Sequence, residues 1–163
     1  MKKVSKKVIL LGHFGVGKTS LVRRFVHQKF SEEYKTTIGV NIDKKVLVLE
    51  NEELTMIIWD IEGGSTQNKL PQSYFLGAHG ILYVFDLARP NTFDNVEGEL
   101  AFFRELLPTA KVRIIGNKKD LLSAEQLEQV RESIAADAYT SAKTGEQVED
   151  MFRELGIEMV GSA

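Results

Sequence analysis

A glycine-rich segment between two apolar stretches most constrains what this chain can fold into. Residues 12–19 read Gly-His-Phe-Gly-Val-Gly-Lys-Thr, after the apolar run 8–11 and before the helix-like segment 20–26. This order predicts a strand, a tight turn and a helix, with Gly-x-x-x-x-Gly-Lys-Thr on the turn. The glycines allow backbone N–H groups to point at phosphate oxygens, and the helix adds its positive N-terminal end. A glycine-rich turn that binds nothing is the alternative, and the readable flanking elements argue against it.

The two residues that close this motif carry its chemistry. The Lys18 ammonium can reach the β- and γ-phosphates of a nucleotide, and the Thr19 hydroxyl can coordinate magnesium. The segment therefore predicts a phosphate loop, here residues 12–19.

Length and composition exclude several other classes of protein. The 163 residues, 43% hydrophobic and 27% charged, fit one domain over 1–163 with its own core. The net charge of −2 gives no strong attraction to nucleic acid, and the absence of cysteine suits a reducing compartment. No stretch approaches the ~20 apolar residues of a membrane helix, and the apolar run after the first lysines is too short for a signal peptide. We expect a cytoplasmic protein.

Strand and helix patterns alternate along the whole chain. We expect strands near 6–11, 40–50, 53–60, 80–86, 112–116 and 138–140, and helices near 18–28, 96–107, 127–134 and from 148 onward. Thr144 and Gln147 are expected to form a capping box before the last helix. Alternation of this kind predicts a mostly parallel sheet with helices on both faces. Ligands on such sheets bind beyond the carboxyl ends of the strands, which are followed here by the phosphate loop, Asp60, Asp86 and Asn117.

Two further segments indicate which base the site reads. The sequence Asn117-Lys118-Lys119-Asp120 comes directly after a strand, and the Asp120 carboxylate can accept from both the ring N–H and the exocyclic amine of guanine. Adenine has no such donor pair and would leave the carboxylate unpaired. Ser141-Ala142-Lys143 follows the last short strand. Both segments could instead be ordinary surface loops, but their order behind a phosphate loop favours guanine.

In order and content these motifs resemble those of the Ras superfamily of small GTPases over essentially the whole chain. Within that superfamily the resemblance is to Rab-like proteins. The resemblance implies an α/β fold of the P-loop NTPase type, with a mostly parallel six-stranded sheet. It implies a molecular switch that binds GTP or GDP with Mg²⁺, hydrolyses GTP to GDP, and is read by regulatory and effector proteins.

The resemblance also assigns roles to individual residues. The nucleotide contacts that it implies are Gly12, His13, Phe14, Gly15, Val16, Gly17, Lys18, Thr19, Ser20, Phe30, Tyr34, Thr37, Gly63, Asn117, Lys118, Asp120, Ser141, Ala142 and Lys143. Magnesium would be held by Thr19 and Thr37, with Asp60 acting through water. The residues expected to act in catalysis are Lys18, Thr37, Gly63 and Glu62. The Ala142 N–H would cap the guanine oxygen.

Two segments are expected to respond to the nucleotide. Thr37 would close on magnesium and the Gly63 N–H on the γ-phosphate, so that residues 31–43 and 60–77 order around GTP and relax after hydrolysis. A partner that prefers the ordered loops then binds in a nucleotide-dependent way. Phe30 packs either against the base or only at the end of the first helix.

Three positions depart from the family pattern. Gly64 stands where Ras-like enzymes carry the glutamine that orients the attacking water, so we expect slow intrinsic hydrolysis. Glu62 replaces a small residue, and its carboxylate could repel the γ-phosphate, bind magnesium or position the water. Phe14 could crowd a partner's arginine or shield the site from water. The alternative for all three is tolerated drift in a protein that still cycles.

The arginines bear on whether the chain itself assists hydrolysis, and its C-terminal residues bear on attachment to a membrane. Arg23 and Arg24 are expected on a solvated helix face or in ion pairs, and Arg89 away from the phosphates. No lipidated cysteine tail is present, so we expect no direct lipid anchor.

Two functions from different classes remain open. One is a GTPase that hydrolyses slowly and is assisted by a partner. The other is a GTP-bound scaffold with little or no hydrolysis, favoured by Gly64 and Phe14. A third, an ATP-using phosphoryl-transfer enzyme, conflicts with Asn117 and Asp120.

Overall fold

The central sheet of the protein sorts its apolar side chains to two faces. In the computed structural model, which describes residues 1–30, 39–61 and 71–161, six strands lie in the order β2-β3-β1-β4-β5-β6. They span Lys2–Leu11 (β1), Val40–Val48 (β2), Glu52–Ile61 (β3), Gly80–Asp86 (β4), Lys111–Asn117 (β5) and Ala138–Tyr139 (β6). All neighbours are parallel except β2 and β3, which form an antiparallel hairpin. The predicted mostly parallel, six-stranded α/β sheet is confirmed.

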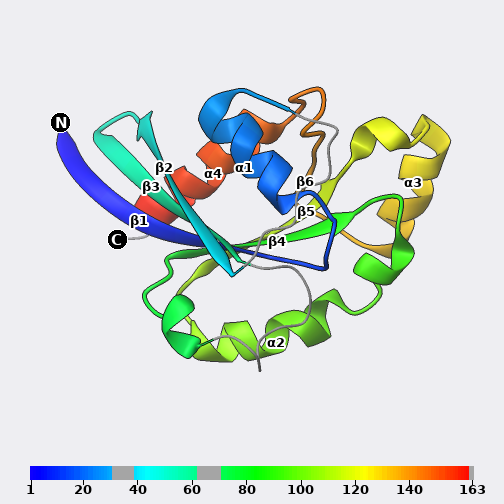
Figure 1. Cartoon of the computed structure of the whole chain (residues 1–163), viewed down its shortest axis with the longest axis horizontal. Helices are drawn as coiled ribbons and strands as arrows, with labels where there is room; N and C mark the ends of the chain where they lie inside the picture. Colours follow the sequence, from blue (N-terminus) through cyan, green and yellow to red (C-terminus); the bar gives the residue numbers. More distant parts are fainter. Residues whose placement is uncertain (31–38, 62–70, 162–163) are drawn as a thin grey trace.

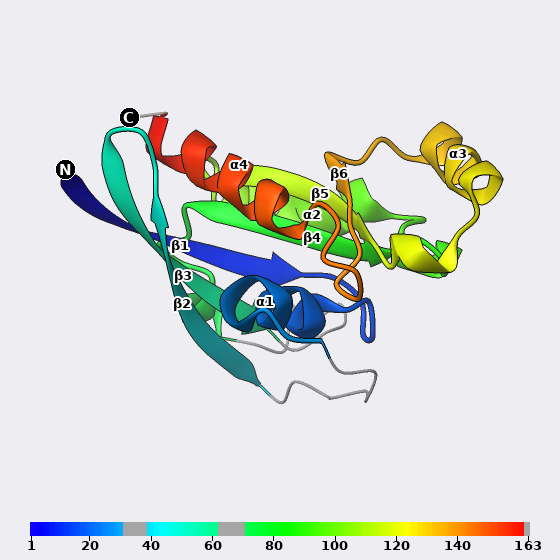
Figure 2. The same cartoon turned by 90° about the horizontal axis from the view of Figure 1, so that it is seen from above.

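Helices cover both faces of this sheet. The α-helices are α1 (Lys18–His27), α2 (Val96–Leu106), α3 (Ala124–Ser133) and α4 (Val148–Gly161), with short 3₁₀ turns η1 (Gln72–Tyr74), η2 (Pro90–Thr92) and η3 (Lys119–Leu121). Figure 1 shows α1 and α4 on one side of the sheet and α2 on the other. Figure 2, turned by 90°, shows α1 and α4 lying next to each other along the same face.

The period-2 pattern of the strands explains this layering. In β1, Val8 and Leu10 pack under α1 and α4, whereas Ile9 and Leu11 face the side covered by α2. Every residue of β4 is buried, as expected for a parallel strand covered on both faces.

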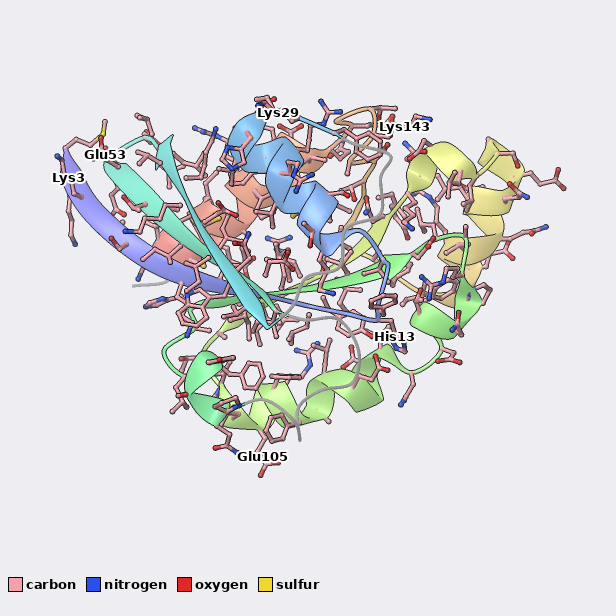
Figure 3. The ribbon with its side chains drawn as sticks, in the orientation of Figure 1. Lys3, His13, Lys29, Glu53, Glu105 and Lys143 are labelled. Carbon is pink, nitrogen blue, oxygen red and sulfur yellow. The ribbon has the colours of Figure 1, made fainter. Side chains whose placement is uncertain are left out.

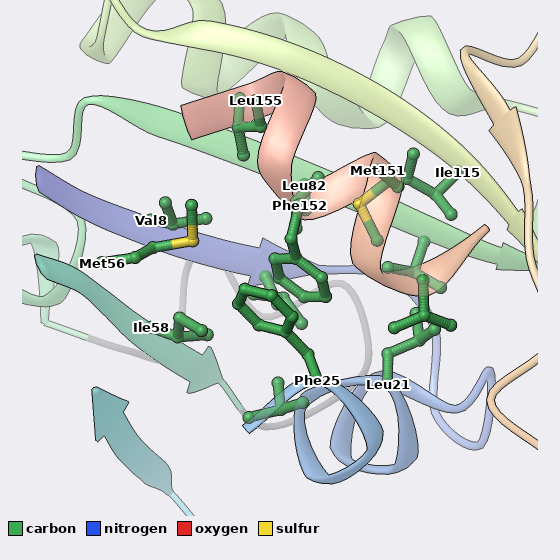
Figure 4. Packing of buried hydrophobic residues seen from close by; sticks show 14 of the residues in the cluster. Val8, Leu21, Phe25, Met56, Ile58, Leu82, Ile115, Met151, Phe152 and Leu155 are labelled. Carbon is green, nitrogen blue, oxygen red and sulfur yellow. The ribbon is translucent and has the colours of Figure 1, made fainter. Parts of the chain in front are cut away.

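The rings of Phe25 from α1 and Phe152 from α4 stack at the centre of one core (Figure 4), with centroids 4.1 Å apart. Stacked rings in such a core add about 1 kcal/mol beyond area burial. Helix α1 is therefore anchored by apolar packing, independently of its polar contacts.

The predicted start of the first strand was wrong. The first strand begins at Lys2, because its lysine-rich start pairs with the glutamates of β3, Lys2 opposite Glu52 and Lys3 opposite Glu53. The Lys3 ammonium lies 3.8 Å from the Glu53 carboxylate, and both are labelled at one end of the sheet in Figure 3. Two adjacent pairs of lysines on a half-exposed strand thus do not stop pairing, because the neighbouring strand supplies the hydrogen bonds.

The predicted capping box at Thr144 and Gln147 was also wrong. Gln147 has a left-handed backbone with φ of 63°, and α4 begins one residue later. The Thr144 hydroxyl instead accepts from the Glu146 N–H within the preceding turn. A capping box is present at α3, where Ser123 and Gln126 exchange side-chain and backbone hydrogen bonds.

The helix expected near 127–134 also has different bounds, because α3 begins at Ala124 and ends at Ser133. Ile134 is the C-cap residue of α3 with an extended backbone, so the helix stops at Ser133.

Candidate functional site

The polar residues that follow the strands gather at one edge of the sheet. The register places Asp60 of β3 beside Leu10 of β1, and Asp86 of β4 beside Asn117 of β5. The phosphate loop leaves β1 at the same edge, so these parallel strands bring their carboxyl ends together there. The edge matches the position predicted from the strand order.

The phosphate loop has a backbone shape that only glycine allows at two positions. Gly12 and Gly17 have φ of 148° and 100°. A Cβ on Gly12 would lie 2.2 Å from the Val84 carbonyl oxygen, and one on Gly17 would lie 2.3 Å from the Asn117 side-chain nitrogen. The loop is therefore pressed against β4 and against the end of β5.

The start of α1 carries the cation and the hydroxyl that the motif predicts. The Lys18 side chain is only 6% exposed. Burial lowers the pKa of Lys18, and the nearby Asp60 carboxylate acts in the opposite direction. The Thr19 hydroxyl donates a hydrogen bond of 2.6 Å to the Asp60 carboxylate. Cation, hydroxyl and carboxylate thus meet at one point at the N-terminal end of α1.

This donor set fits magnesium. Mg²⁺ prefers hard oxygen ligands and is commonly held by one or two carboxylates together with substrate phosphates. Thr19 and Asp60 supply a hydroxyl and a carboxylate already in contact. Among residues 1–30, 39–61 and 71–161, no group of three or more His, Cys, Asp or Glu side chains could hold a metal by itself. The third predicted ligand, Thr37, lies outside the described residues.

Asn117 joins the base motif to the phosphate loop. Its buried side-chain amide donates to the Val16 carbonyl at 3.0 Å and accepts from the Thr140 hydroxyl at 3.0 Å. Lys118 adds a second link, because its ammonium donates to the Gly15 carbonyl at 2.8 Å and lies 3.2 Å from Asp86. The two motifs are therefore bonded to each other directly.

The Ser141 hydroxyl orients the carboxylate that is predicted to read the base. It donates to Asp120 at 2.7 Å and accepts from the Thr144 N–H at 3.1 Å. Ala142 is buried beside it, and Lys143 is exposed. These contacts hold the Asp120 carboxylate and the start of the following turn in place, while the roles of all these residues toward a nucleotide stay predictions.

Two arginines contact main-chain carbonyls of loops at the site. Arg24 was expected on a solvated face or in an ion pair, but its guanidinium donates to the carbonyls of Ala142 and Lys143. Arg89 donates to the Phe14 carbonyl at 3.0 Å and lies 3.8 Å from the Asp86 carboxylate, and its expected position away from the phosphates stays a prediction. Both arginines therefore hold the main chain of predicted binding loops.

A partly buried polar chain supports the phosphate loop from the α2 side. His13 Nε2 lies 2.6 Å from the Glu99 carboxylate of α2, and that carboxylate also accepts from the Tyr83 hydroxyl of β4. Figure 3 shows His13 at the end of β1, on the side of the sheet that α2 covers. Burial and the bond to Glu99 raise the pKa of Tyr83 well above its ordinary value.

The remaining predicted residues differ in how far the structure describes them. Phe30 is half-buried and packs against the core under α1 and α4, so helix-end packing is observed and a base contact stays a prediction. Ser20 is half-buried on α1, and the Phe14 side chain is 51% exposed. The predictions for Tyr34, Thr37, Glu62, Gly63 and Gly64 lie outside the described residues.

Sequence reasoning missed Arg24, Arg89 and Glu99. The arginines bond to main-chain carbonyls, which every residue has, so no complementary side chain in the sequence marks the contact. Glu99 carries a weak signal, as an acid on the buried side of a helix that only a polar partner could satisfy.

The fold and this loop define a nucleotide-binding protein of the phosphate-loop class. A family model described as the Ras family matches residues 7–160. The chain is 36% identical over 156 residues to the Ras-related protein RABA1c of Arabidopsis thaliana, covering 91% of this chain and 72% of the relative. It is 33% identical over 160 residues to the GTP-binding protein ypt3 of Schizosaccharomyces pombe, covering 94% and 75%. Mouse Rab-7b is 35% identical over 124 residues, covering 74% and 62%.

The chain therefore belongs to the Ras family of small GTPases. In the parts of the chain that the structure describes, no helix is long and apolar enough to cross a membrane.

Proposed function

We propose that this protein is a switch that binds GTP or GDP with magnesium and hydrolyses GTP slowly. The observation that carries the proposal is the bonding of the base motif to the phosphate loop through Asn117 and Lys118. A site built this way binds the base and the phosphates of one molecule as a unit. A protein that recognised phosphate alone would have no use for Asp120 held in place by Ser141.

Base recognition rests on Asp120 and the loop after β6. Guanine presents two neighbouring donors to a carboxylate, and its oxygen can accept from the Ala142 N–H. Adenine offers neither, so it would cover the Asp120 carboxylate and the Ala142 N–H without pairing them. The hydrogen bond from Ser141 fixes one Asp120 oxygen and leaves the other for the base.

The phosphates are proposed to lie over residues 12–19, with Lys18 as the cation and Thr19 and Asp60 at the metal. Magnesium, when bound, neutralises charge that develops on the β- and γ-phosphate oxygens. Lys18 suits the same task, since a buried ammonium attracts phosphate more strongly than a hydrated one.

Hydrolysis is proposed to be slow because Gly64 has no side chain to orient water. Protein partners in the cytoplasm are proposed to read residues 31–43 and 60–77, and one of them to supply the missing catalytic group. Glu62 is the first alternative for positioning the water.

Changing the base-reading carboxylate tests the proposal. In Asp120→Asn the amide can donate to the second oxygen of xanthine but cannot accept from both guanine donors. We expect GDP affinity to fall by roughly 100-fold and xanthosine diphosphate to bind better than it does to the wild type. Asp150→Asn on α4 is the matched control. Unchanged GDP affinity in Asp120→Asn would remove the base assignment.

Single-turnover phosphate release from GTP-loaded protein separates the switch from the scaffold. A rate near or below about 3–5 × 10⁻⁴ s⁻¹, the value for unassisted Ras, is expected. The half-exposed Phe14 beside the phosphates favours the scaffold, because it could hinder a partner's arginine. GTP retained through purification would support the scaffold, and bound GDP would support the hydrolysing switch.

A further inference from the structure

The loop after β6 is held by a side chain from the far end of the site. The Arg24 Nε donates to the Ala142 carbonyl at 2.7 Å, and its Nη2 donates to the Lys143 carbonyl at 2.5 Å. Arg24 lies on α1, six residues after Lys18, so one short helix links the phosphate end to this loop. The link spans 118 residues of sequence.

A tight turn in the loop after β6 packs against the side chain of Arg24. Gly145 has φ of 87°, and a Cβ there would come within 3.7 Å of Arg24 Cδ. The Gly145 N–H donates to the Ser141 carbonyl at 2.8 Å, which closes a tight turn over residues 141–145. The guanidinium is a planar fork, so two bonds from it fix both the distance and the orientation of the main chain.

Hydrogen bonds hold the main chain on both sides of the Ala142 amide. On its N-terminal side, Ser141 is bonded to Asp120 and to the Thr144 N–H. On its C-terminal side, Arg24 holds the Ala142 and Lys143 carbonyls. The direction of the Ala142 N–H is therefore set by both neighbours together.

We propose that Arg24 is a positioning residue for base recognition, which aims the Ala142 N–H at the oxygen on C6 of guanine. The inference rests on the proposed function, because it assumes that this loop reads a guanine nucleotide. The guanidinium of Arg24 bonds to the Ala142 and Lys143 carbonyls, so its proposed effect acts through Ala142. The stacking of Phe25 on Phe152 keeps α1 in place without it, so the effect stays local to the loop.

The test compares GDP with 6-thio-GDP, in which sulfur replaces the oxygen on C6. Sulfur accepts hydrogen bonds weakly, so the analogue reports the readout at this one atom. In Arg24→Ala we expect GDP to bind roughly tenfold more weakly, since a charge-assisted bond no longer holds the loop. The loss for 6-thio-GDP is expected to be about twofold or less, so the preference for GDP over the analogue collapses.

Two variants serve as controls. Arg23→Ala makes the same charge change on the neighbouring helix position and should leave both affinities unchanged. Arg24→Lys keeps the charge without the planar fork and should recover part of the preference for GDP. Thermal unfolding of each variant checks that the fold persists, and Arg24→Lys keeps the test valid if Arg24→Ala does not fold.

The outcomes separate this inference from the proposed function. Equal losses for GDP and 6-thio-GDP, or no loss, would overturn the positioning role of Arg24 while guanine binding stands. A wild-type protein that prefers GDP no more than ADP would overturn the proposed function, and the inference with it.

Discussion

In the phosphate loop three carbonyls accept from side chains of distant elements, Phe14 from Arg89, Gly15 from Lys118 and Val16 from Asn117. In the loop after β6 a single arginine, Arg24, holds two carbonyls. A loop that turns N–H groups toward a ligand turns carbonyls elsewhere, and those carbonyls need donors. In the phosphate loop these donors come from three side chains, whereas in the loop after β6 both come from Arg24.

The two loops also differ in how their shape arises. The phosphate loop depends on glycines pressed against neighbouring backbone and amide groups, which no other residue can replace. The loop after β6 has a buried alanine and a serine whose hydroxyl both donates and accepts. We therefore expect the phosphate loop to fail through steric overlap and the other loop through lost hydrogen bonds.

The largest effect is expected for Gly17→Ala. The new Cβ would overlap the Asn117 amide and strain a left-handed backbone, so we expect GDP affinity to fall roughly 100-fold, or about 3 kcal/mol. Gly77→Ala is the control, because Gly77 has φ of 78° but nothing within 4 Å of the added carbon. It should lower stability by about 1 kcal/mol and leave nucleotide titrations unchanged. Similar binding by both variants would refute the steric account.

Asn117→Ala should come next. It leaves the Val16 carbonyl and the Thr140 hydroxyl without their partner in a buried site, so we expect a loss of about 2 kcal/mol in GDP binding. Thr140→Val removes only the second bond and should weaken GDP binding by about 1 kcal/mol or less. Isothermal titration of both variants measures this. If Thr140→Val is the more damaging change, the bond to Val16 does not carry the link.

A smaller effect is expected at high pH from the polar chain under His13. Burial and Glu99 raise the pKa of Tyr83 above its ordinary 10.0, so the unfolded chain releases this proton first as pH rises. The stability from neutral Tyr83 is complete below pH 10 and is lost above it. Chemical unfolding at pH 8 and 11 should show about 1 kcal/mol more loss in wild type than in Tyr83→Phe. Equal losses would exclude this linkage.

The smallest effect is expected for Arg89→Ala. The Arg89 side chain is 41% exposed and its bond to the Phe14 carbonyl can be replaced by water, so we expect GDP affinity to fall by about 0.5 kcal/mol. The ratio of GDP to 6-thio-GDP affinities should not change, in contrast to Arg24→Ala. Arg104→Ala on α2, which pairs with Glu97, is the surface control. A change in that ratio would mean that the two loops are not held separately.

The sequence predicted the sheet, its helices and the gathering of strand ends because those follow from periodicity and from glycine and proline chemistry. It also predicted that Asp60, Asp86 and Asn117 lie at one edge of the sheet, since each stands at the carboxyl end of a strand. The bonds of Arg24 and Arg89 to main-chain carbonyls were missed because carbonyl oxygens carry no residue identity. The capping box was misplaced because Gln147 adopts a left-handed backbone that the motif does not anticipate.

The bond from Asn117 to the Val16 carbonyl joins two groups of the protein itself, so it constrains the phosphate loop without any ligand atom taking part. Its loop is therefore preorganised, and the conformational entropy of ordering it is lost when the chain folds rather than when a ligand arrives. Binding free energy is then available for contacts with the ligand itself. When the ligand leaves, this loop regains little conformational entropy. A preorganised loop of this kind therefore favours long residence times of the ligand.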